Sequence, residues 1–255
     1  MKKILVLMLM VITLAAHSQK NTLTTVNTVK PKKGQKMAFE TAYKQHIAKF
    51  HGASEKLSVY EILSGPYQGY YHTVSSGQSF ADFDKDRPDA NAHSLDLDKT
   101  FFPLLDETMN ATYVFVDSLS VHSSNSEAES FVVTIRHLKQ ELEMRDYRRE
   151  SARGAKISSV YKAPFFENLS VNYFEQLWDG SDQVTVSVRA LKDGFKSLEQ
   201  DYYPAAPKGF PSWRDEYVKL YGHDAWDVRD KLLEGAVVKT EQYIMRLRKD
   251  LSSKN

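Results

Sequence analysis

The chain has 255 residues, no cysteine and a formal net charge of +1. The near balance of 34 basic and 33 acidic residues lacks the electrostatic signature of a protein that binds nucleic acid or an anionic membrane surface. Without cysteine there is no disulfide, so stability must come from a packed core, to which aromatic residues at 12% of the chain can contribute.

The first 18 residues have the pattern of a cleaved export signal. A basic start at residues 2–3 precedes an apolar stretch at 4–16, which is shorter than a membrane span. Small residues at Ala16 and Ser18 fit a cleavage site after Ser18. We therefore expect residues 1–18 to be a signal peptide. The mature protein should be periplasmic or secreted, without membrane insertion.

The rest of the chain separates into two similar stretches joined by a polar segment. Residues 123–130, SSNSEAES, are rich in serine, which is typical of a linker. We therefore expect a disordered lead-in at 19–23, a first unit at 24–122, the linker at 123–130, a second unit at 131–250 and a tail at 251–255.

The first unit has the order strand, helix, strand, strand, helix, strand. Apolar residues recur at helical spacing at Phe39, Tyr43, Ile47 and Phe50. The stretch 57–74 reads as two strands around a Ser-Gly-Pro turn. The predicted elements are a strand at 24–29, a helix at 35–50, the hairpin at 57–74, a helical segment at 91–109 and a strand at 112–121. Pro103 must either kink the helical segment or lie in the first turn of a second short helix.

The second unit repeats that order with an extra helix. Ser212, with Asp215 three residues later, resembles a capping box at a helix start. The helix at 142–162 interleaves acidic and basic residues, which favours a solvated, salt-bridged face. The predicted elements are a strand at 131–137, the helix at 142–162, a hairpin at 169–188 turning at 179–180, a helix capped by Ser212, a helix at 224–238 and a strand at 240–248.

The two units also share residues at corresponding places, which predicts an internal duplication. The spacings between matching residues drift by only a few positions. The matches are Leu57-Ser58-Val59 with Leu169-Ser170-Val171, Phe80 with Phe195, Asp86 with Asp201, and Leu104-Leu105-Asp106 with Leu232-Leu233-Glu234.

This order of elements is ferredoxin-like. With its long first helix and glycine-containing hairpin, the chain resembles the dimeric α/β-barrel superfamily in a tandem-duplicated form. The resemblance covers most of the mature chain and rests on topology, not on a catalytic motif. It implies an α+β fold in which two ferredoxin-like (βαββαβ) units pack sheet to sheet as an intrachain α/β barrel, so a homodimer is not required to close it. Members include monooxygenases, haem-binding or haem-degrading enzymes, and units with no known activity.

Motifs of common catalytic chemistries are missing from the sequence. Residues 77–81, GQSFA, lack the second glycine of a nucleophile elbow. The eleven glycines are scattered singly, so neither a Walker A loop nor a dinucleotide-binding fingerprint is present. The sequence therefore identifies no hydrolase and no nucleotide-binding enzyme.

Two patterns in the sequence match known metal sites only in part. The acidic run 82–86 begins like a calcium loop, but Arg87 stands where the sharp turn requires glycine and His93 where a bidentate glutamate is needed. His46 and His51 are five apart on the predicted helix, so their side chains should diverge by roughly 140°. We therefore predict no metal site.

Aromatic residues and a histidine gather at the return of the first hairpin. The matching strand of the second hairpin carries Val184, Val186 and Val188, which we expect to pack beneath helices, leaving Thr185 and Ser187 between the sheets. The predicted ligand-binding residues are Tyr60, Tyr70, Tyr71, His72, Thr185 and Ser187.

The direction of His72 depends on the register between the hairpins. Matching Val74 with Val188 places His72 on the valine face. Matching Phe80 with Phe195 places it on the opposite face, because a slip of one residue turns every side chain over. Both alternatives remain open at this point.

We therefore expect an exported, non-catalytic binding or structural module. It would hold a small apolar or aromatic ligand between its sheets, or bind an envelope protein, without a cofactor. The alternative is a cofactor-poor monooxygenase, or a haem-binding or haem-degrading enzyme of the dimeric α/β-barrel type, with His72 as candidate catalytic residue.

Overall fold

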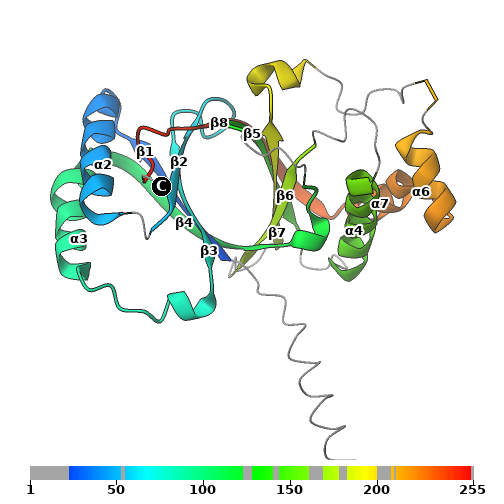
Figure 1. Cartoon of the computed structure of the whole chain (residues 1–255), viewed down its shortest axis with the longest axis horizontal. Coiled ribbons are helices and arrows are strands. Elements are labelled where there is room, and N and C mark those ends of the chain that lie inside the picture. The colour runs from blue at the N-terminus through cyan, green and yellow to red at the C-terminus, as the bar shows by residue number, and fades with distance from the viewer. Residues whose placement is uncertain are drawn as a thin grey trace, which may run out of the picture.

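The computed structural model describes residues 23–52, 55–122, 128–139, 144–160, 169–177, 183–199, 208–209 and 211–253. Within them, eight antiparallel strands close into a barrel in the ring order β1-β3-β2-β8-β5-β7-β6-β4 (Figure 1). The strands are β1 (Leu23–Pro31), β2 (Leu57–Ile62), β3 (Tyr71–Gln78), β4 (Leu105–Phe115), β5 (Ser130–Leu138), β6 (Val171–Leu177), β7 (Gln183–Leu191) and β8 (Val237–Leu247). The predicted signal peptide and the turn at 179–180 lie outside the described residues.

The described helices lie outside the barrel, in two groups on opposite sides (Figure 1). One group is α2 (Lys36–Phe50) and α3 (Ala90–Asp96); the other is α4 (Met144–Val160), α6 (Trp213–Tyr221) and α7 (Ala225–Leu233). Short π or 3-10 turns cover Phe80–Asp82, Leu97–Phe101, Phe102–Leu104, Asp117–Leu119 and Gly194–Leu198. No helix in the described part of the chain is both long and apolar enough to cross a membrane.

The apolar stripe predicted for the first helix packs on the outer face of the barrel. Phe39, Tyr43 and Ile47 of α2 are buried against a cluster that includes Tyr71 of β3 and Phe101. The Tyr43 hydroxyl is hydrogen-bonded to Thr73. Burial of these rings, at roughly 25 cal/mol per Å² of apolar surface, attaches α2 to the sheet. The inner face of the barrel is therefore not covered by this helix.

Two seams join the early and late strands of the ring. β2 pairs with β8 where Tyr60 faces Leu247, and β4 pairs with β6 where Phe115 faces Phe174. Both seams are antiparallel ladders of backbone hydrogen bonds, so neither the first four strands nor the last four form a closed structure alone.

The predicted direction of the valines in β7 is wrong. Val184, Val186 and Val188 face into the barrel, and the alternate residues Thr185 and Ser187 therefore face outward. The inward residues of β7 lie opposite inward residues of β5, such as Ile135 opposite Val186. Apolar side chains face inward because they pack against one another inside the barrel, whereas the outer face below the helices is partly polar.

Two predicted helices are too long. The α-helix expected within 91–109 ends at Asp96 and is followed by a π turn and a short 3-10 helix that begins with Phe102 and Pro103, as one of the two alternatives for Pro103 predicts. β4 begins at Leu105, seven residues before the expected 112. Strand pairing decides this boundary, since residues 107–114 pair with β1 along its length. The helix expected at 224–238 ends at Leu233, and Gly235 adopts a left-handed backbone with φ 67° before β8 begins.

The predicted divergence of His46 and His51 is also wrong. α2 ends at Phe50, and His51 has φ −119° and ψ 81°, which is not a helical conformation. The angular argument required a continuous helix through both residues. Their side chains converge with that of His93, and all three ligand atoms lie within 4.8 Å of one another.

The capping prediction at Ser212 is confirmed. The Ser212 side chain accepts a hydrogen bond from the Asp215 backbone N–H at 3.0 Å and begins α6 at Trp213.

Candidate functional site

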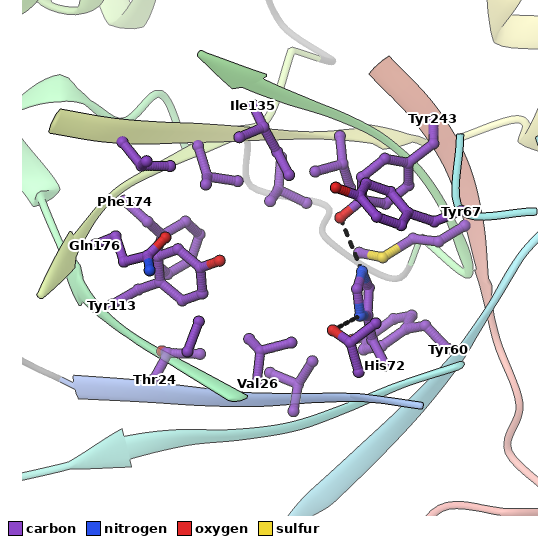
Figure 2. Close-up of a pocket in the computed structure, with 18 of the residues that line it drawn as sticks. Thr24, Val26, Tyr60, Tyr67, His72, Tyr113, Ile135, Phe174, Gln176 and Tyr243 are labelled. Carbon is purple, nitrogen blue, oxygen red and sulfur yellow. Dashed lines mark hydrogen bonds between the residues drawn. The ribbon is translucent and has the colours of Figure 1, made fainter. Parts of the chain in front are cut away.

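The barrel encloses a cavity of about 380 Å³ that is lined by inward side chains from all eight strands (Figure 2). This volume lies within the range of about 300–1,000 Å³ typical of small-molecule sites. Most of the lining is apolar, and it includes Val26, Val74, Val133, Ile135, Phe131, Phe174, Val184, Val186, Val188 and Met245. The cavity therefore suits a small molecule with a largely apolar body.

His72 provides the central polar group of the wall. Its Nδ1 lies 2.8 Å from Thr28 Oγ1, and its Nε2 lies 2.8 Å from the Tyr243 hydroxyl. The sheet register places these groups together, because Thr28 of β1 is paired directly with His72 of β3. Figure 2 shows the His72 imidazole at the cavity surface, bonded to Tyr243, with Tyr113 and Phe174 across the cavity.

Burial controls the ionisation of this group of residues. Only 8% of His72 is exposed, and desolvation lowers its pKa to about 4 from the ordinary value of 6.5. Burial also raises the pKa of Tyr243 far above its ordinary value. At neutral pH the site thus holds a neutral imidazole and a protonated phenol.

The neutral imidazole can relay a proton. One of its nitrogens donates a hydrogen bond while the other accepts one. When Nε2 accepts from the Tyr243 hydroxyl, Nδ1–H donates to Thr28 Oγ1. A molecule in the cavity can therefore lose a proton to the Tyr243 oxygen while Tyr243 passes its own proton to His72 Nε2.

A second polar group surrounds Glu241. The Tyr67 hydroxyl donates to Glu241 Oε1 at 3.1 Å, and His137 Nε2 lies 3.1 Å from Oε2. Lys239 Nζ is 2.9 Å from Oε1. Burial acts to raise the pKa of Glu241, but the hydrogen bonds from Lys239, His137 and Tyr67 outweigh it and lower the pKa. The carboxylate is therefore ionised and already paired.

The structure separates the predicted ligand-binding residues. Tyr60 and His72 line the cavity, and His72 lies on the same face as the valines, as the match between Val74 and Val188 predicts. Tyr70 precedes β3, packs edge-on against Tyr67, and donates to Glu107 at 2.8 Å.

The other three predicted residues face away from the cavity. Tyr71 is buried beneath α2 and donates to Glu40 at 2.5 Å. Thr185 is 1% exposed on the outer face of β7. Ser187 lines a second, smaller cavity of about 180 Å³ with residues of α4, α6 and α7. Their predicted place between the sheets is wrong because it rested on the reversed direction of β7.

Sequence reasoning missed the two partners of His72. Thr28 and Tyr243 come from the first and last strands of the chain, and only barrel closure brings them to the same imidazole. The alternation of Glu241, Tyr243 and Met245 in the last strand was a usable signal, because all three share the inner face.

Haem does not fit this cavity. Both nitrogens of His72 are engaged, so coordination of iron would break one of its two hydrogen bonds. Among the described residues, the lining contains neither lysine nor arginine to pair with the propionate groups of haem. These residues thus favour a neutral organic molecule over haem.

No protein-family model and no curated protein sequence matches this chain. Among similar solved structures, a protein of Lactobacillus acidophilus provisionally named a monooxygenase is 8% identical, with 92% of this chain and 96% of that chain covered and a TM-score of 0.54. Another provisionally named monooxygenase, from Fusobacterium nucleatum, is 8% identical over 91% and 94% of the two chains, with a TM-score of 0.50. A mutant chlorite dismutase from Candidatus Nitrospira defluvii is 9% identical over 89% and 92%, with a TM-score of 0.50.

The expectation of a non-catalytic module is contradicted by this comparison, because these neighbours are named as enzymes. The predicted resemblance is confirmed for the fold. This chain is an α+β protein with a closed antiparallel barrel, and its fold is similar to those of these solved structures.

Proposed function

We propose that this protein is an enzyme that oxidises a small, neutral, electron-rich aromatic molecule with dioxygen inside its barrel, without haem. The observation that carries the proposal is the apolar cavity with a neutral histidine held between two hydroxyls on its wall. The names of two structural neighbours, both provisional monooxygenases, agree with this reading. The fold alone does not select a reaction, so the argument rests on the cavity.

The lining defines the class of substrate. An anionic molecule would find no lysine or arginine among the described wall residues and would lie near the ionised Glu241. A cationic one would compete with Lys239 for that carboxylate. A neutral aromatic molecule with one or two hydroxyl groups would bury its ring among the valines and phenylalanines and bond to Tyr243 or His72.

The reaction balances without an external reductant. An activated CH₂ group beside a phenol ring reacts with O₂ to give C=O and H₂O. One oxygen atom enters the substrate, the other leaves as water, and the substrate supplies the electrons. Removal of the first proton makes the substrate electron-rich enough to react with O₂. The proton would pass to the Tyr243 oxygen while Tyr243 gives its own to His72 Nε2.

The electrostatics of the cavity support this transfer. The buried imidazole is neutral before reaction and therefore able to accept a proton. An anion formed next to it would stabilise the imidazolium and raise the pKa of His72 in the complex. The mostly apolar wall lowers the polarity around this pair, which strengthens that interaction.

Oxygen consumption with a panel of phenolic and polycyclic aromatic compounds tests the proposal. We expect uptake of one O₂ per oxidised molecule, and Tyr243→Phe should lower kcat by about 10²-fold or more. His72→Gln should have a similar effect. The matched control is Tyr71→Phe. Tyr71 is next to His72 in β3, but its hydroxyl lies on the outer face of the barrel, away from the cavity. Absence of both binding and oxygen uptake, or an unchanged rate in Tyr243→Phe, would exclude this function.

We also propose that the barrel arose from two copies of one ferredoxin-like unit. The first half contributes its strands in the order β4-β1-β3-β2 and the second in the order β8-β5-β7-β6, which is the same fourth-first-third-second arrangement. An experimental structure in which the two halves superpose strand for strand would support this origin, and a different strand order in either half would contradict it.

Export is proposed from the first residues alone. A basic start, an apolar stretch and small residues before Gln19 are the observations that support it. Mass spectrometry of the protein recovered from its native host should find Gln19 at the N-terminus. Recovery of the uncleaved chain from the cytoplasm would contradict export.

A further inference from the structure

Three histidines converge on the outer side of the barrel, at a place separate from the cavity. His46 lies about one turn before the end of α2, His51 follows that helix, and His93 lies in α3. Their Nε2 atoms are 3.1 Å apart for His46 and His93, 3.1 Å for His51 and His93, and 3.3 Å for His46 and His51. The corresponding ring centroids are 4.6, 5.1 and 5.2 Å apart, so the rings point their Nε2 atoms toward a common point.

The tautomers of two of these rings are determined by carboxylates. His46 Nδ1 lies 2.9 Å from Asp96 Oδ2, and His51 Nδ1 lies 2.5 Å from Glu55 Oε2. A carboxylate only accepts, so each Nδ1 carries the hydrogen. In the neutral rings, Nε2 of His46 and Nε2 of His51 then each carry a lone pair, and the two lone pairs face each other. His93 can donate one hydrogen bond from its Nε2 to only one of these lone pairs. The other lone pair therefore lacks a positively charged partner.

A metal ion would supply that charge with suitable geometry. Zinc binds imidazole nitrogen at about 2.0–2.1 Å in a tetrahedral arrangement, which places two ligand nitrogens roughly 3.3 Å apart. The three observed separations of 3.1–3.3 Å match that spacing with little movement. Imidazole ligands also favour zinc and its neighbours in the transition series over calcium or magnesium.

The outer partners are themselves held in place. Lys49 Nζ contacts Asp96 Oδ1 at 2.8 Å, and Arg87 Nη1 donates to Glu55 at 2.9 Å. Arg87 also donates to the Phe50 carbonyl at 2.6 Å, which ties the end of α2 to the loop before α3. Histidines oriented by carboxylates through the nitrogen that does not bind metal are characteristic of zinc sites.

We propose that His46, His51 and His93 bind one divalent transition-metal ion of the zinc class through their Nε2 atoms. His46 is 3% exposed, whereas His51 and His93 are only partly buried, so the fourth coordination position faces the solvent side. None of the three lines the barrel cavity. The ion would join the end of α2 to α3 and leave one position for water or an external ligand.

Metal binding by the full chain without a histidine tag tests the site. After dialysis against a chelator, titration with Zn²⁺ should give a stoichiometry of one and raise the unfolding temperature as the ion concentration increases. Co²⁺ should give the intense visible absorption of a low-coordinate nitrogen site. His93→Ala should lose the Co²⁺ absorption and weaken Zn²⁺ binding by more than about 100-fold. Asp96→Asn, which removes only an outer partner, should weaken it by about 10–100-fold.

His122→Ala is the matched control, because His122 is an exposed histidine paired with Asp117 outside this cluster. It should bind Zn²⁺ as the unaltered chain does. Absence of Co²⁺ absorption in the unaltered chain, or equal Zn²⁺ affinity in His93→Ala, would overturn the proposal. The Co²⁺ spectrum of the unaltered chain does not depend on the folding of any variant. It therefore tests the site even if the alanine variants are unstable.

Discussion

His72 is held in the neutral form by its surroundings, and this links its ionisation to folding. The folded protein lowers its pKa to about 4, whereas the unfolded chain restores the ordinary value of 6.5. The contribution to stability is therefore complete above pH 6.5 and is lost as the pH falls toward 4, because only the unfolded state then takes up the proton.

The expected loss of unfolding free energy between pH 7 and pH 4 from this residue is about 3 kcal/mol. Urea unfolding at pH 7, 5.5 and 4 measures it, with His72→Gln as comparison, since glutamine does not titrate in this range. The unaltered chain should lose more stability than the variant. Parallel pH dependence in the two proteins would show that His72 does not carry the effect.

At the scale of one element, the backbone of the β2–β3 hairpin turn lies in close contact with β8. Gly65 has φ 79°, and a Cβ added there would lie 2.4 Å from the Gln242 carbonyl oxygen and 2.9 Å from the Tyr243 Cβ. Gly69, in the same turn, has φ 84° but nothing within 4 Å of such a Cβ. A side chain at Gly69 would therefore cause backbone strain alone, whereas one at Gly65 would cause backbone strain and a steric clash.

We predict that Gly65→Ala destabilises the protein by more than about 3 kcal/mol, while Gly69→Ala costs about 1 kcal/mol from backbone strain alone. Chemical denaturation measures both. The Gly65 variant should also weaken binding in the cavity, because the clash displaces the strand segment that carries Tyr243. Equal costs at the two positions would mean that the hairpin turn moves freely away from β8.

At the scale of the whole molecule, the two seams make the barrel one cooperative unit. β2–β8 and β4–β6 each pair a strand of the first half with one of the second. Loss of either half would leave two open sheet edges and expose the valine-rich interior. We therefore expect the first four and the last four strands not to fold independently of each other.

Thermal unfolding should accordingly show one transition. All three tryptophans fall within residues 131–250, so tryptophan fluorescence reports on the second half, while far-UV circular dichroism reports on the whole chain. The two midpoints should coincide. A separate, earlier transition in either signal would show that the halves unfold independently.

The sequence by itself determined the α+β class, the alternation of strands and helices and the buried stripe of α2. Those features follow from local periodicity, as Phe39, Tyr43 and Ile47 illustrate. Only the tertiary structure decided which way His72 and the valines of β7 point, since one residue of register reverses a strand. It also decided that His46, His51 and His93 meet, because the end of α2 turns His51 back toward a histidine more than forty residues away in the chain. Contacts between distant segments depend on where elements end and how they pair, and local sequence does not specify either.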